Sequence, residues 1–131
     1  MIAVDTSAIT ALLLSESGSE QIERLLISAP CAMTAATRVE LGMVVESRTG
    51  AEGVQLLEEL LDRVDMQIVP VDTRLANEAL VCWRRFGKGR HKASLNFGDT
   101  FSYALAIQTG SPLLFVGKDF AQTDVVPAWA S

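Results

Sequence analysis

The 131-residue sequence predicts a three-layer α/β/α domain with a central parallel sheet, and three observations support this fold class. Short apolar runs alternate along the chain with longer segments of helical periodicity. The runs are continuously apolar, which is typical of parallel strands that are buried on both faces. Hydrophobic residues make up 49% of the chain, enough for a full core in one domain spanning residues 1–131.

The apolar runs and the helical segments follow one another without a linker or repeat. Strands are expected at residues 2–4, 31–33, 67–71 and 113–116, with a short edge strand at 125–126. Helices are expected at 8–14, 18–29, 35–48, 50–64, 73–86 and 97–109. The expected capping boxes are Ser17 with Glu20 and Thr49 with Glu52, the expected N-caps are Thr34 and Asp72, and the expected helix-ending glycines are Gly87 and Gly110.

Composition excludes several classes of protein. Lys and Arg number 11 and Asp and Glu number 16, so the net charge of −5 excludes a wholly basic nucleic-acid binder, although it allows a local basic patch. The N-terminus has no basic segment of a signal peptide, and no apolar run approaches the roughly 18 residues of a membrane helix. Cys31 and Cys82 match no metal or redox spacing. We therefore expect a cytoplasmic protein with two reduced, buried thiols and no membrane partner.

Four acidic residues stand where solvent-exposed charge is not expected. Asp5 follows the first strand, and Asp119 follows the last long strand by three residues. Glu40 falls within the apolar arc of its helix, and Asp99 stands in the first turn of an otherwise uncharged helix. Taken singly, each acid also suits a structural role. Asp5 could cap a strand end, and Glu40 could lie at the edge of the apolar stripe and reach solvent. Asp99 could be favoured by the helix dipole, and Asp119 could belong to a surface turn.

As a set, the four acids are expected to meet at the carboxyl edge of the sheet, where open α/β folds form their sites. Carboxylates crowded there repel one another by about 4 kcal/mol per pair at about 4 Å and an effective dielectric near 20. Shared protons or a divalent metal must offset that repulsion. An all-oxygen site suits Mg²⁺ or Mn²⁺, and zinc is disfavoured because the chain has one His and no nearby set of Cys ligands.

The motifs around these acids occur in order along nearly the whole chain. They are DTSA beginning at Asp5, VEL around Glu40, LNFGD ending at Asp99 and followed by FSYALA, and LLFVGKDF containing Asp119 and followed by Thr123-Asp124. Together they resemble the motifs of PIN-domain ribonucleases. More narrowly, they resemble the VapC toxins of bacterial type II toxin–antitoxin systems.

The resemblance implies metal-dependent cleavage of RNA by an endoribonuclease. The catalytic residues that it implies are Asp5, Glu40, Asp99 and Asp119. Asp5 and Asp99 are the expected direct ligands of Mg²⁺, or alternatively Mn²⁺, and a metal-activated water is the expected nucleophile. The expected supporting residues are Thr6, Ser7, Asn96 and Asp124, of which Asp124 competes with Asp119 for the role of fourth acid.

The resemblance also implies a cognate VapB-like antitoxin as protein partner. Apolar residues in the two helices nearest the amino end are expected to provide its docking groove. An Arg or Lys of the antitoxin is expected to reach Asp5, Glu40 and Asp99, replacing the charge of a metal ion. A homodimer is expected as well, because such surfaces can pair across a two-fold axis.

A basic loop precedes Asp99, and it contains five of the eleven cations within nine residues. They are Arg84, Arg85, Lys88, Arg90 and Lys92. We expect this loop to bind the RNA backbone, since an acidic site that cuts a polyanion needs cations beside it. A solvated loop whose first arginines complement a helix C-terminus is the structural alternative. Trp83 and Phe86, which are interleaved with the cations, fit an apolar helix stripe and are expected to lie in the core.

The strongest functional alternative is a phospho-acceptor signalling module of the receiver type, which also has an acidic Mg²⁺ pocket at strand ends. That class requires adjacent acids on the first strand and an acceptor Asp after the third. Here Val4 precedes Asp5, and Asp72 leads directly into a helix. A binding protein that keeps the fold without catalysis is a third class, and the four intact acids argue against it.

Overall fold

The computed structural model describes residues 1–129, and four parallel strands form its centre. The strands are β1 (Ile2–Val4), β2 (Cys31–Thr34), β3 (Gln67–Val69) and β4 (Leu113–Leu114). Their order in the sheet is β3-β2-β1-β4, so the first strand in sequence lies in the interior, with Ala3 opposite Ala32 on one side and Leu113 on the other. The carboxyl ends of all four strands therefore point to the same edge of the sheet.

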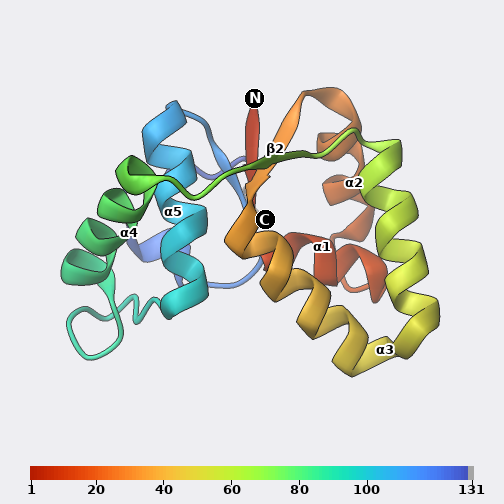
Figure 1. Ribbon diagram of the computed structural model, residues 1–131, viewed down its shortest axis with the longest axis horizontal. Helices are drawn as coiled ribbons and strands as arrows, with labels where there is room; N and C mark the ends of the chain where they lie inside the picture. The colour runs from red at the N-terminus through yellow and green to blue at the C-terminus, as the bar shows by residue number, and fades with distance from the viewer. Residues whose placement is uncertain (130–131) are drawn as a thin grey trace.

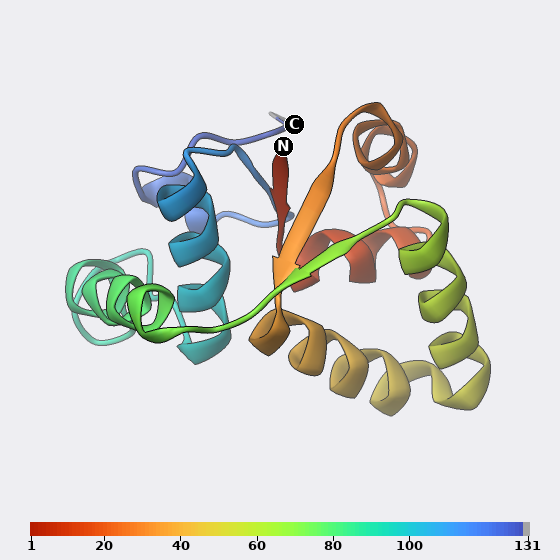
Figure 2. The same cartoon turned by 45° about the horizontal axis from the view of Figure 1, so that its top comes forward.

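Helices cover both faces of this sheet, which confirms the predicted three-layer α/β/α class (Figure 1). The helices are α1 (Thr6–Leu13), α2 (Ser19–Ser28), α3 (Ala35–Arg63), α4 (Thr73–Phe86) and α5 (Phe97–Thr109), followed by a 3₁₀ turn η1 (Phe120–Gln122). Figure 2 shows α4 and α5 on one side of the strands, and α1, α2 and α3 on the other. No helix among residues 1–129 is both long and apolar enough to cross a bilayer.

Successive side chains of a strand point to opposite faces of the sheet, and this alternation divides the core into two halves. Ile2 and Val4 of β1 pack with α1, α2 and α3, whereas Ala3 between them packs with α4 and α5. Small side chains at Ala3 and Ala32 leave room for α5, which packs directly on β1 and β2. This central position explains why α5 has no charged residue after its first turn. Cys31 and Cys82 are free and buried, as predicted.

The predicted division into two helices near residue 49 is confirmed, because a kink at Gly50 interrupts α3 (Ala35–Arg63). Gly50 has φ 69° and ψ −161°, which are not helical dihedral angles, so two helical halves meet there. Thr49 is not an N-cap, because its hydroxyl donates to the carbonyl of Val45 at 2.6 Å. Glycine accepts this left-handed φ without a Cβ penalty, and the two halves of α3 therefore bend around the apolar face of α1 (Figure 1).

Other element ends differ in detail from prediction. The capping box at Ser17 is wrong, because α2 begins after Gly18 with no side-chain cap. Thr34 and Asp72 do cap α3 and α4 as predicted, through the N–H groups of Thr37 and Leu75. Gly110 ends α5 at φ 63°, whereas Gly87 ends α4 without a positive φ.

The predicted strands are longer than the observed ones at two places. β3 stops before Pro70, whose missing N–H cannot extend a ladder. β4 contains only Leu113 and Leu114, although both backbone groups of Leu113 bond to the predicted edge segment, its N–H to the carbonyl of Val126 and its carbonyl to the N–H of Ala128. These two bonds make an isolated parallel bridge at Pro127 in place of a strand at 125–126.

Candidate active site

A cleft of about 330 Å³ opens at the carboxyl edge of the sheet. Three of the four predicted acids, Asp5, Glu40 and Asp99, line it together. Each comes from a different element: the end of β1, the second turn of α3 and the first turn of α5. The parallel topology thus brings together residues that are 35 to 94 positions apart in sequence, as the sequence predicts.

The carboxylate of Asp5 is the most buried of these acids, with 4% of its surface exposed. It caps α1, accepting from the N–H of Ser7 at 3.1 Å and from its hydroxyl at 2.7 Å, both at Oδ2. The hydroxyl of Ser102 on α5 donates to the other oxygen, Oδ1, at 2.5 Å. Ser7 Oγ also accepts from the N–H of Val116, which ties the segment after β4 to the same group. A buried carboxylate requires such donors, and here both oxygens have them.

Glu40 is half-buried and is oriented by α1 and α5. Thr6 Oγ1 donates to Glu40 Oε1 at 2.6 Å. The other oxygen, Oε2, would lie 2.0 Å from a Cβ atom at residue 98, so only glycine allows Glu40 to approach the start of α5 this closely. The structure therefore assigns roles to the predicted supporting residues Thr6 and Ser7 as donors to two of the acids.

Asp99 is half-buried in the first turn of α5, where it forms a capping box with Asn96. The N–H of Asp99 donates to Asn96 Oδ1 at 2.9 Å, and the N–H of Asn96 donates to Asp99 Oδ2 at 3.0 Å. The pKa of Asp99 is raised to about 6, chiefly by burial and in addition by the charges of Asp5, Glu40 and Asp119, against the lowering effect of the Asn96 hydrogen bond. The crowding of acids that the sequence predicts is therefore one of the two causes of the raised pKa.

The two candidates for the fourth acid have different surroundings. Asp119 is exposed and lies outside the lining of the cleft, but its charge contributes to the raised pKa of Asp99. Asp124 is part of another cluster, in which it accepts from the hydroxyl of Tyr103 at 2.7 Å and pairs with Arg85 at 3.3 Å. Asp124 therefore links the C-terminal segment to α4 and α5, and Asp119 is the one electrostatically coupled to Asp99.

The cations of the predicted RNA-binding loop are all exposed, but two of them are engaged within the protein. Arg85 pairs with Asp124, and its guanidinium lies 4.7 Å from the Phe86 ring centroid. The guanidinium of Arg90 lies 4.5 Å from the Trp83 ring centroid. The prediction that Trp83 lies in the core is wrong, because the indole is 42% exposed and Arg90 covers one of its faces; Phe86 is buried as predicted.

Three other cations of this loop region extend into solvent. They are Arg84, Lys88 and Lys92. Within residues 1–129, these three side chains form no ion pair. Their charges are therefore available to an anionic ligand.

Sequence reasoning did not identify three residues that shape the cleft: Ser102, Gly98 and Arg48. Ser102 is a buried polar residue in a helix that has no charged residue after its first turn, which is a signal that it satisfies another buried group. Gly98 stands inside the first turn of a helix, where glycine is unfavourable unless another group approaches closely. Arg48 carried no signal in the sequence, because its position beside the cleft depends on the packing of α3 on α1.

The donor set of the cleft consists of carboxylate oxygens. Among the described residues, no three His, Cys, Asp or Glu side chains are grouped closely enough to hold one ion as they stand. The oxygens of Asp5, Glu40 and Asp99 nevertheless face one cleft, and their mutual repulsion is visible in the pKa of Asp99. Hard oxygen donors of this kind suit Mg²⁺ or Mn²⁺ rather than zinc.

A parallel α/β sheet with three acids at its carboxyl edge defines the class of protein. The chain belongs to the PIN domain family, whose model matches residues 2–126. More narrowly, it belongs with the VapC ribonucleases. It is 44% identical to a ribonuclease VapC of Mycolicibacterium smegmatis, over 95% of this chain and 97% of that protein. It is likewise 44% identical to ribonuclease VapC42 of Mycobacterium tuberculosis, with the same coverage.

Solved structures share the fold at lower sequence identity. VapC20 of Mycobacterium tuberculosis, described as a toxin that cleaves the sarcin–ricin loop, matches with a TM-score of 0.76 and 21% identity over 96% of this chain and 97% of that one. A toxin–antitoxin complex from Klebsiella pneumoniae matches with a TM-score of 0.70 and 18% identity over 96% and 95%. These likenesses confirm the predicted PIN-like fold.

The raised pKa of Asp99 predicts how stability depends on pH. Because the folded protein holds this proton more tightly than the unfolded chain, the free energy of unfolding should fall as pH rises from 3.8 to about 6. Asp99→Asn removes the repelled charge while keeping an oxygen for the Asn96 N–H. We expect this variant to be more stable than the parent by about 1–3 kcal/mol at pH 7, and equal to it near pH 4.

Urea unfolding in EDTA across this pH range measures the difference between the two proteins. Asp62→Asn, which changes an exposed carboxylate on α3, is the charge-matched control and should follow the parent. An Asp99→Asn variant that is less stable than the parent at pH 7 would contradict the repulsion.

Proposed function

We propose that the chain is a Mg²⁺-dependent endoribonuclease that acts as the toxin of a toxin–antitoxin pair. The observation that supports this most directly is the shared cleft of Asp5, Glu40 and Asp99, with Asp5 buried and fully hydrogen-bonded. Relatives that are 44% identical over nearly their whole length are named ribonucleases. The receiver alternative is not favoured, because Asp72 is occupied as the N-cap of α4.

The donor chemistry of the cleft, rather than the present spacing of its side chains, fits a divalent cation. Asp5 and Asp99 would hold it, and Glu40 and Asp119 would complete the acidic surroundings. When bound, such an ion supplies Lewis acidity toward a phosphodiester and a lowered pKa for water. Zinc would require His or Cys ligands, which these surroundings do not provide.

The side chains of the protein contribute positioning. Ser7 and Ser102 fix both oxygens of Asp5, and Thr6 fixes Glu40, so neither carboxylate needs to be ordered during the reaction. Asp99 holds a proton at its carboxyl group below about pH 6 and is ionised above it. Activity is therefore expected to increase as Asp99 loses that proton, since only the ionised carboxylate can act as a ligand.

Replacing the carboxylates tests the proposed active site. Asp5→Asn and Asp99→Asn are each expected to reduce cleavage of total cellular RNA at least about 100-fold, because they remove ligand charge while preserving shape. Asp124→Asn is the control, since Asp124 belongs to the Tyr103–Arg85 cluster, and it should retain cleavage. Gel analysis of RNA fragments gives the rates, and circular dichroism checks folding.

The same assay tests the metal. Mg²⁺ or Mn²⁺ should restore cleavage after EDTA treatment, and Zn²⁺ should not. Undiminished cleavage in EDTA, or full activity of Asp99→Asn, would be incompatible with this site.

The loop region before α5 is proposed to bind the RNA backbone. Lys88 and Lys92 are exposed and unpaired within residues 1–129, whereas Arg85 is held by Asp124. Lys88→Ala/Lys92→Ala should weaken RNA binding and make its salt dependence shallower by up to about two units of slope. Arg85→Ala should mainly lower thermal stability, because it breaks the contact with Asp124 and Tyr103.

Fluorescence anisotropy of a labelled RNA oligonucleotide in EDTA at several salt concentrations separates these effects. Equal salt slopes for the parent and the lysine double variant would contradict RNA binding by these lysines. They would favour the alternative of a solvated loop whose first arginines complement the C-terminus of α4.

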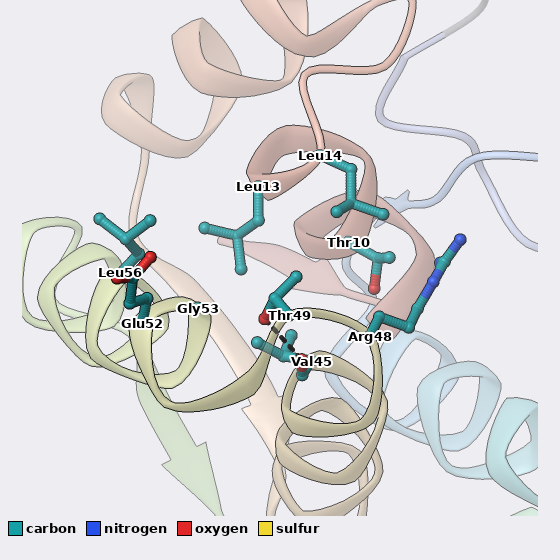
Figure 3. Close-up of a pocket in the computed structure, with 9 residues that line it drawn as sticks. All are labelled: Thr10, Leu13, Leu14, Val45, Arg48, Thr49, Glu52, Gly53 and Leu56. Atoms are coloured by element: carbon teal, nitrogen blue, oxygen red, sulfur yellow. Dashed lines mark hydrogen bonds between the residues drawn. The ribbon is translucent and has the colours of Figure 1, made fainter.

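An antitoxin is the proposed protein partner, and a groove beside the cleft is its proposed docking site. The groove has a volume of about 160 Å³ and lies between α1 and the bend of α3 (Figure 3). The sequence-based prediction that it lies on the two helices nearest the amino end is wrong for α2, because Ile22 and Leu26 of that helix are buried. Leu13, Leu14 and Leu56 give it an apolar lining. Thr10 lines both the groove and the acidic cleft, so a segment bound in the groove could place an Arg or Lys beside the carboxylates. The solved neighbour from Klebsiella pneumoniae is itself a toxin–antitoxin complex.

A single charge in this groove should block the partner. Leu56 is 55% exposed, so Leu56→Glu should preserve the fold and weaken binding of the co-expressed antitoxin at least about tenfold, since burying an unpaired carboxylate is costly. Ile68→Glu, at an exposed position on the edge strand β3, is the matched control. Co-purification and isothermal titration calorimetry report binding, and complex formation should suppress cleavage by the parent. Equal affinity of both variants would place the partner elsewhere.

A homodimer is also proposed, through a second apolar surface. Leu80, Trp83, Phe97 and Phe101 line a hollow of about 740 Å³ between α4 and the start of α5, and Phe97 is 79% exposed. This hollow lies on the opposite face of the sheet from the groove, so a second copy and an antitoxin would not compete. Light scattering during size exclusion of the free protein, performed with the antitoxin experiment, distinguishes one chain from two.

A further inference from the structure

Arg48 is a cation beside the acidic cleft. It lies on α3, two residues before the bend at Gly50, and its side chain is exposed. It lines the same cleft as Asp5, Glu40 and Asp99. Figure 3 shows its side chain extending past Thr10, with the guanidinium directed away from Leu13 and Leu56. Arg48 thus lines both the groove and the cleft, and its guanidinium is directed away from the apolar lining of the groove.

The charge of Arg48 is not used within the described part of the chain. Two other arginines have partners there: Arg38 on the same helix pairs with Glu58 at 2.6 Å, and Arg85 pairs with Asp124 at 3.3 Å. Arg48 has no carboxylate within ion-pair distance among residues 1–129, although its cleft contains several. A guanidinium left free beside carboxylates is available to an anion that the cleft receives.

The placement of Arg48 is complementary to that of the basic loop. Arg48 belongs to the helix layer of α3, whereas the loop at 87–96 follows α4 in the layer on the other side of the sheet (Figure 1). The elements that carry the carboxylates, which are the end of β1 and the starts of α3 and α5, lie between the bend of α3 and this loop (Figure 1). An RNA strand bound by the loop cations alone would meet only the negative charges of the carboxylates on the side away from the loop. A cation on α3 provides an attractive charge on that side.

We propose that Arg48 binds a phosphate of the RNA strand next to the one that lies at the carboxylates. This inference rests on the proposed nuclease function and adds a substrate-binding residue to it. The planar guanidinium donates two parallel hydrogen bonds to the non-bridging oxygens of one phosphate. Together with the loop cations, Arg48 would hold the strand on both sides of the cleft and thereby set its path across the carboxylates.

Binding and kinetics of three variants test this role. Arg48→Ala should weaken binding of a labelled single-stranded RNA oligonucleotide about tenfold in EDTA and reduce the salt slope by about one unit. With Mg²⁺, its KM should rise by a similar factor while kcat changes less, because a phosphate contact away from the reacting bond binds substrate and transition state alike. Arg48→Lys should restore the slope but only part of the affinity, since an ammonium lacks the paired donors of a guanidinium.

Arg38→Ala is the matched control, because it removes the same charge from the same helix at a side chain that already has a partner. It should bind RNA as the parent does. If Arg48→Ala binds RNA with the affinity, salt slope and KM of the parent, and the parent cleaves RNA, the role of Arg48 is wrong. The proposed nuclease function would then still stand. A fall in thermal stability of Arg48→Ala with unchanged RNA binding would assign the guanidinium to neutralising the acids. A parent that neither binds RNA nor cleaves total cellular RNA would overturn the nuclease function together with this inference.

Discussion

The buried carboxylate of Asp5 is the constraint on which the arrangement of the site depends. A charge with 4% exposure is tolerable only when donors surround it, and Ser7 and Ser102 supply them from two helix layers. Ser7 also accepts from the N–H of Val116, beyond β4. One carboxylate thus joins α1, α5 and the segment after β4, so α5, which carries Asp99, is tied directly to Asp5.

Fixing Asp5 has an electrostatic consequence for the rest of the cleft. Thr6 and Gly98 bring Glu40 against the start of α5, and the capping box with Asn96 holds Asp99 beside it. The pKa of Asp99 is raised because neither burial nor its neighbours favour its charge. The protein therefore retains a local destabilisation in its native state, as is common where function requires like charges to converge. A cation, whether a metal ion or a side chain from a partner, would relieve that repulsion.

Local sequence patterns predicted the elements and the three acids, but they could not predict contacts set by packing. Asp5, Glu40 and Asp99 follow from strand ends and helix periodicity. The Ser102–Asp5 bond joins residues 97 positions apart, and the close approach of Gly98 to Glu40 depends on how two helices meet. Trp83 fits an apolar stripe by spacing, yet the stacked Arg90 allows it to remain at the surface. The break expected near Thr49 occurs at Gly50, whose non-helical backbone turns the chain between the two halves of α3.

Charge distribution resolves the apparent conflict between an acidic chain and a polyanionic substrate. The net charge of −5 repels RNA at long range, but salt screens that field beyond about 10 Å, so local charges decide close contacts. Arg48 on α3 lines the cleft, and the exposed lysines Lys88 and Lys92 belong to the loop that leads into α5 and Asp99. Arg85, by contrast, is bound to Asp124 and serves packing. Within one acidic surface, then, the cations with internal partners stabilise the fold, and those without such partners are the ones proposed to direct an RNA strand toward the carboxylates.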